Sequence, residues 1–100
     1  MLKNYAHTTV ASTPATLVTV ATGHEVAIVS LLAAAGDNAG NLTVAVNDGI
    51  SDIWSCIMAL TANNAAFLDS KIFLPAGYLL KVTGSVDGIK IMVSADDSEV

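Results

Sequence analysis

Apolar and polar residues alternate along several short segments of the chain, and a period of two is typical of a β-strand with one buried face. The alternation is clearest in LTVAVN at 42–47, YLLKVTG at 78–84 and GIKIMVS at 88–94. The apolar residues expected to face inward are Leu42, Val44, Val46, Leu80, Val82, Ile89, Ile91 and Val93. The opposite faces of these strands are expected to remain at least partly accessible.

Two longer segments are apolar on both faces, EVAIVSLLAAA at 25–35 and ISDIWSCIMAL at 50–60. In the first segment, strand alternation places Val26, Ile28 and Leu32 on one face and Ala27, Val29 and Leu31 on the other. We interpret both segments as strands that are covered on one side by the core and on the other by a neighbouring subunit. A helix over SLLAAA (30–35) is the alternative, because Ala and Leu favour helices.

The segment AAFLDSKIFL at 65–74 also alternates. Its inward positions are Leu68, Ile72 and Leu74, and its outward positions are Phe67, Asp69, Lys71 and Phe73. Two outward phenylalanines beside a charged pair are candidate interface anchors, and a second layer of the monomer's own core is the alternative interpretation. The same two interpretations apply to Trp54. Tyr5 completes the candidate interface residues, because the N-terminal segment is expected to form an edge strand or to reach a neighbour.

Turn-forming residues separate these segments at short intervals, which predicts an all-β domain. The turn signals are Thr22-Gly23, GDNAGN (36–41), Asp48-Gly49, TANNA (61–65), Pro75-Ala76-Gly77 and Asp87-Gly88. We predict a single two-sheet β-sandwich or jelly roll of about seven to eight strands. Residues 1–15 are expected to form an N-terminal edge strand or arm, residues 16–95 the sandwich, and residues 96–100 an acidic, solvated tail.

The composition gives a reason to expect self-association. Of the 100 residues, 53% are hydrophobic and 13% are charged, whereas about 25% charged residues are usual. This is more apolar surface than one small core is expected to hide, and a subunit interface is the leading explanation. We expect a homo-oligomer, with a trimer favoured.

The charge balance argues against nucleic-acid binding. The net charge is -5, with four Lys and no Arg, and Arg supplies the bidentate contacts to phosphates and base edges. The longest nearly polar-free run, 26–35, falls well short of the ~20 residues that a spanning helix needs, so no membrane partner is expected. MLKNYAHTT (1–9) lacks the hydrophobic core of a signal peptide, and we expect synthesis in the cytoplasm without classical export.

Residues that could carry chemistry are few and scattered. Cys56 is the single cysteine, and neither His7 nor His24 has partner ligands at metal-binding spacing. The sequence contains neither a G-x-S-x-G turn nor a phosphate-binding glycine loop. The carboxylates that could form catalytic pairs are Glu25, Asp37, Asp48, Asp52, Asp69 and Asp87. Most of these six lie in predicted turns or on outward faces. We expect no enzyme activity, no cofactor and no metal site.

Two turns, VATG at 20–23 and LPAG at 74–77, each precede an apolar strand, and the strand at 44–49 ends in an Asp-Gly turn. In these turns and in their hydrophobic spacing, the segments 16–49 and 71–97 resemble small virion structural proteins of tailed bacteriophages. The resemblance implies a β-sandwich that works as an oligomer on a virus particle, as a capsid decoration (cement) protein or an accessory tail component. The implied partner is a major capsid or tail protein, and the implied location is the virion.

A carbohydrate-binding or adhesion module is the alternative function, since β-sandwiches often present loops to sugars. The scarcity of aromatic platforms weakens it, because only Trp54 lies in the middle of a predicted strand. A small enzyme built on the carboxylates is the third interpretation and the least favoured.

Overall fold

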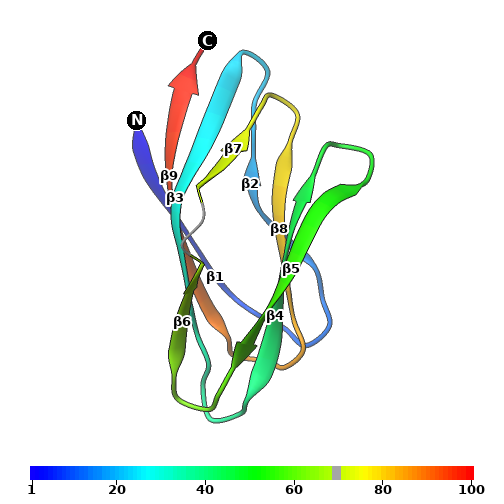
Figure 1. Cartoon of the computed structure of the whole chain (residues 1–100), viewed down its shortest axis with the longest axis vertical. Helices are drawn as coiled ribbons and strands as arrows, with labels where there is room; N and C mark the ends of the chain where they lie inside the picture. Colours follow the sequence, from blue (N-terminus) through cyan, green and yellow to red (C-terminus); the bar gives the residue numbers. More distant parts are fainter. Residues whose placement is uncertain (69–70) are drawn as a thin grey trace.

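The computed structural model describes residues 1–68 and 71–100, and within them the chain forms nine β-strands and no helix (Figure 1). The strands are β1 (Leu2–Thr8), β2 (Ala15–Thr19), β3 (His24–Ala34), β4 (Gly40–Asn47), β5 (Asp52–Leu60), β6 (Ala65–Leu68), β7 (Ile72–Leu74), β8 (Leu79–Gly84) and β9 (Lys90–Glu99). The described ranges accordingly hold no helix with the length and apolarity of a membrane span.

The strands form two antiparallel sheets that pack face to face (Figure 1). The first sheet has the order β1-β9-β3-β6, with β7 also paired with β3, and the second has the order β2-β8-β4-β5. The predicted all-β, two-sheet sandwich is confirmed. More strands are present than predicted, in part because the 65–74 segment is divided into β6 and β7, which pair with different parts of β3.

Alternate residues from both sheets fill the core. Every residue predicted to face inward from 42–47, 78–84 and 88–94 is buried. In the 65–74 segment Leu74 is buried, whereas Phe67 and Phe73 on the opposite face are exposed. The alternative of a helix over 30–35 is wrong, because β3 continues through Ala34 with pairing partners on both sides.

A β-bulge in β3 changes which of its residues face the core. The pairing of β3 with β9 shifts by one residue between Ile28 and Ser30, so Val29 is an extra residue in the strand. Beyond the bulge Leu31 is 1% exposed and faces the core, whereas Leu32 is 37% exposed and lies outside. The prediction that Leu32 shares a face with Val26 and Ile28 is therefore wrong, since simple alternation does not allow for an extra residue.

Both ends of the chain belong to the first sheet (Figure 1). β1 lies at its edge and pairs along β9, which itself runs to Glu99 between β1 and β3. The boundary expected at residue 95 thus lies inside β9, and residues 96–99 are strand instead of a solvated tail. These residues pair with 24–27 of β3, and Asp97 contacts Lys3 Nζ at 3.0 Å and His24 Nδ1 at 2.8 Å, so its charge has partners within the sheet.

Candidate functional site: an apolar row and an aromatic groove

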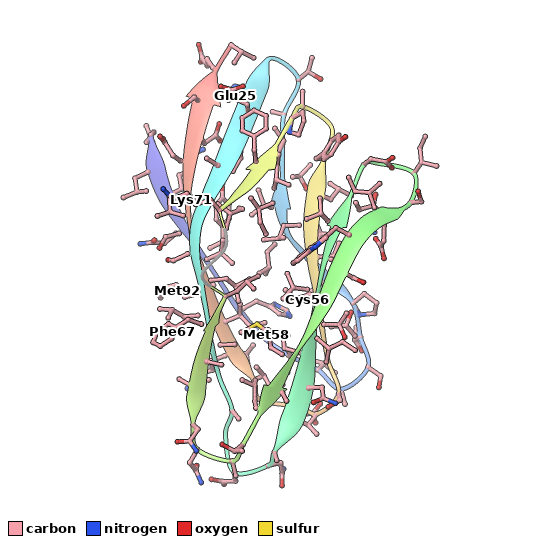
Figure 2. The ribbon with its side chains drawn as sticks, in the orientation of Figure 1. Glu25, Cys56, Met58, Phe67, Lys71 and Met92 are labelled. Carbon is pink, nitrogen blue, oxygen red and sulfur yellow. The ribbon has the colours of Figure 1, made fainter. Side chains whose placement is uncertain are left out.

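Four apolar side chains form a continuous row across the outer face of the first sheet. Ala6 is paired with Met92, Met92 with Leu32, and Leu32 with Phe67, so the row crosses β1, β9, β3 and β6 in register. Phe67 is 71% and Met92 45% exposed. Figure 2 shows both of these side chains on the side of the sheet that faces away from the core. We call Ala6, Met92, Leu32 and Phe67 the apolar row.

The next outward row carries smaller side chains. It consists of Thr8, Lys90, Ala34 and Ala65, again paired in register across the same four strands. Because two of these four residues are alanines, a shallow open depression of about 720 Å³ lies here, bordered by Leu32 and Met92. Lys90 is the one charged side chain in the two rows, so this part of the outer face is an apolar surface with little charge.

The bulge at Val29 determines which leucine of β3 belongs to the apolar row. If β3 alternated regularly through Val29, Leu32 would share the inward face with Ile28, and Leu31 would lie outside in its place. Val29 itself is exposed on the same outer surface. The sequence indicated that β3 is apolar on both faces, but period-two alternation grouped Leu31, instead of Leu32, with Ala27 and Val29.

The four predicted interface residues lie in three different places. Phe67 belongs to the apolar row, whereas Tyr5 is half-buried and packs against the core. Phe73 lies on β7 opposite Ala27 and is exposed. Trp54, 41% exposed on β5, lines a groove together with Phe73. The structure thus brings Trp54 and Phe73 together and leaves Tyr5 and Phe67 apart from them. Asp69, predicted beside the phenylalanines, lies outside the described residues.

The groove that contains Trp54 is aromatic. Trp54, Phe73 and Tyr78 line it, and its volume is about 400 Å³. Three aromatic side chains from β5, β7 and the loop before β8 therefore converge although the chain has only 5% aromatic residues. Sequence reasoning found Trp54 and Phe73 separately but missed Tyr78, because nothing in the local pattern links residues this far apart.

Two of the titratable side chains, Asp48 and Cys56, have pKa values that are shifted by their immediate surroundings. Within residues 1–68 and 71–100 no group of three or more His, Cys, Asp or Glu side chains could hold a metal ion. Asp48 accepts hydrogen bonds from the N–H groups of Ser51 and Ile50, each at 2.9 Å, and these bonds lower the pKa of its carboxyl group. Partial burial raises the pKa of the Cys56 thiol, which makes it a weak nucleophile at neutral pH.

Asp97 lies in the other notable group of charges. Hydrogen bonds from His24 and Lys3, in that order of importance, lower the pKa of its carboxyl group. The same contact with Asp97 raises the pKa of Lys3. These contacts join β1, β3 and β9 at one end of the sheet, and their arrangement is that of an ion-pair cluster that holds strands together.

Comparison with known proteins adds no relative to this description: no family model matches the chain, and no curated protein matches it.

Proposed function

We propose that this protein is a non-catalytic virion structural subunit, a decoration protein that forms homo-oligomers and binds the capsid of a tailed bacteriophage. The observation that carries the proposal is the apolar row on the outer face of the first sheet. The resemblance in residues 16–49 and 71–97 supplies the choice of the virion. An accessory tail component is the variant of the same proposal.

The apolar row supports an interface through its chemistry. Burying a large apolar side chain is worth roughly 1.5–3 kcal/mol when it passes from full exposure to full burial. Phe67 and Leu32 are 71% and 37% exposed, so each contributes a corresponding part of that amount. A few such side chains give a weak contact in one pair of subunits. In a closed symmetric assembly, or on a particle with many equivalent positions, each subunit makes the contact repeatedly and the weak contacts add. A decoration protein needs this property and does not need an active site.

Measuring mass in solution tests the oligomeric part of the proposal. Light scattering after size exclusion is made on Ile57→Lys protein, so that a contact through the exposed edge of β5 does not add to the mass. Over a range of concentrations it is expected to give the mass of a trimer, while a six-fold ring would favour the tail component. Met92→Lys is expected to reduce the assembly, because it places a charge in the middle of the apolar row. The matched control is Thr19→Lys, which adds the same charge at an exposed position of β2 in the other sheet. A strict monomer at high concentration would contradict self-association.

Composition of purified particles tests the virion part. Mass spectrometry of tailed-phage particles prepared from the source of this chain is expected to detect the protein in many copies for each particle. Its absence from the particles would overturn the virion assignment even if the protein forms a trimer in solution.

The aromatic groove favours a second candidate, a carbohydrate-binding module. Trp54, Phe73 and Tyr78 line one groove, and sugar rings pack their apolar faces on aromatic side chains. Binding to a glycan array that is lost in Trp54→Ala and kept in Phe67→Ala would favour this function. Phe67 is the suitable control because it is an exposed aromatic residue that does not line the groove.

A further inference from the structure

β5 is a long edge strand, most of which lacks the charges, prolines and irregularities that usually prevent an edge strand from pairing with another chain. It spans Asp52–Leu60 and, within the described residues, pairs with β4 alone (Figure 1). Its pairing with β4 is irregular at Ile53 and regular from Trp54 to Leu60. The regular part reads WSCIMAL and contains no charge and no proline. Ile57, at its centre, is 69% exposed.

The direction of the backbone groups follows from the hydrogen bonds of β4. The backbone N–H and C=O of Asn41 both bond to Ser85, beside β8. Since these groups alternate in direction along an antiparallel strand, Leu42, Val44 and Val46 bond toward β5. Their partners are Met58, Cys56 and Trp54.

The residues between those partners therefore direct their backbone groups away from β4. They are Ser55, Ile57 and Ala59, and in the described part of the chain their N–H and C=O groups have no strand to bond with. A row of unpaired donors and acceptors at a sheet edge is a template for another extended strand.

The other sheet edges carry the features that block such pairing. β2 is five residues long, has a register shift after Thr16 and follows Pro14. β6 and β7 are four and three residues long, and Pro75 follows β7. β1 places Lys3 along its edge. Short strands, bulges, proline and lysine all protect edges from association, and the regular part of β5 has none of them.

We infer that β5 pairs with β5 of a second copy of this chain, antiparallel and about a two-fold axis at Ile57. This axis is the centre of the regular stretch, so all of 54–60 is paired. Ile57 then lies opposite Ile57 of the partner subunit, Ser55 opposite Ala59 of the partner subunit, and Cys56 opposite Met58 of the partner subunit. No charge faces another charge, although each chain carries a net charge of -5, and like charges directly opposite would oppose pairing. The result is one continuous sheet through both copies, and it does not depend on the apolar row or on the proposed function.

Light scattering distinguishes this contact from the apolar row. In Met92→Lys protein, where the row is disrupted, β5 pairing is expected to give a dimer. Adding Ile57→Lys is expected to reduce the mass twofold, to a monomer, because two lysines then lie opposite each other at the axis. Met92→Lys with Thr19→Lys is the matched control and is expected to remain a dimer. Circular dichroism checks that each variant keeps its strands.

Cross-linking tests the position of the axis. In a Cys56→Ala background, Ile57→Cys is expected to form an intermolecular disulfide on mild oxidation, since directly paired residues have Cα atoms about 5.5 Å apart. Ser55→Cys is the control: residue 55 and its symmetry mate would be about 14 Å apart along the strands, too far for a disulfide. A cross-link at 55 without one at 57 would overturn the stated axis. A monomeric Met92→Lys protein, or a dimer indifferent to Ile57→Lys, would overturn the pairing itself.

Discussion

The side chain of Thr9 packs directly against the α-carbon of Gly84, leaving no room for a side chain there. A Cβ atom at Gly84 would lie 2.8 Å from the Cβ, Cγ2 and Oγ1 atoms of Thr9. Thr9 is itself buried, and its hydroxyl group donates to the carbonyl of Val86 at 2.8 Å and accepts from the N–H of Ile89 at 3.1 Å. The residue after β1 is thus fixed against the turn that joins β8 to β9.

Gly84→Ala is expected to destabilise the protein by about 1–3 kcal/mol, the usual cost of inserting a methyl group into a packed site. Gly36→Ala is the control, because the nearest atom to a Cβ at Gly36 is the carbonyl oxygen of Gly88 at an ordinary 3.7 Å. Urea unfolding of both variants measures the difference. Equal stability of the two variants would show that Thr9 can move aside.

Thr9→Val tests the two hydrogen bonds that the Thr9 hydroxyl group makes. Valine has nearly the shape of threonine, but it cannot donate to the Val86 carbonyl or accept from the Ile89 N–H. Leaving buried groups without partners costs about 1–3 kcal/mol, so the free energy of unfolding is expected to fall by that amount. Thr8→Val, at the exposed neighbouring position on β1, is expected to change stability by less than about 0.5 kcal/mol. A Thr9→Val protein as stable as the control would contradict the structural role of the hydroxyl group.

Two adjacent leucines test the bulge in β3. Leu31→Ala is expected to cost about 2–5 kcal/mol, because it removes a buried side chain and leaves a cavity. Leu32→Ala removes a side chain that is 37% exposed on the outer face, so the monomer is expected to lose far less stability. Thermal or urea unfolding at low protein concentration, where association does not contribute, gives the comparison. The reverse order of the two effects would mean that β3 has no bulge at Val29.

This pair also marks the limit of what the sequence could predict. Alternation alone predicted the inward-facing apolar residues of β4, β8 and β9, because the opposite face of each strand is more polar. It did not predict that Ala45 and Asn47, on the opposite face of β4, are buried as well. In β3 both faces are apolar, and hydrophobicity could not locate one inserted residue. The order Leu31-Leu32 is consistent with either register.

The sequence likewise predicted only part of the candidate site. Phe67 and Phe73 could be placed outside from local alternation. The apolar row could not be predicted, since it depends on pairings that join Ala6 to Met92 and Leu32 to Phe67 across four strands. The acidic end was predicted as a tail because the local sequence shows the charges of Asp96 and Asp97. It does not show their partners, among them Lys3, which are distant in the sequence and close in the folded sheet.

Asp97 is expected to make stability depend on pH at the acid end. Its hydrogen bonds with His24 and Lys3 lower the pKa of the carboxyl group in the folded state, so the folded protein binds a proton at Asp97 less readily than the unfolded chain does. The stabilising contribution is therefore present above the ordinary pKa of 3.8 and is lost as the pH falls through the lowered value. For Lys3 the pH dependence of stability is reversed. Its pKa is raised above 10.5 in the folded state, so its stabilising contribution is present below 10.5 and is lost as the pH rises through the raised pKa.

Melting temperature measured against pH, for the wild type and for Asp97→Asn, tests this linkage. The amide cannot lose or gain the proton, so Asp97→Asn is expected to melt at a lower temperature at neutral pH and to lose less of its remaining stability below the ordinary carboxyl pKa of 3.8. Asp37→Asn, which removes an exposed carboxylate from the loop between β3 and β4, is the matched control and should follow the wild-type acid profile. If Asp97→Asn and the wild type lost stability in parallel as the pH fell, the ion-pair cluster would not couple β1 and β3 to the end of β9, and the strand would owe its length to backbone pairing alone.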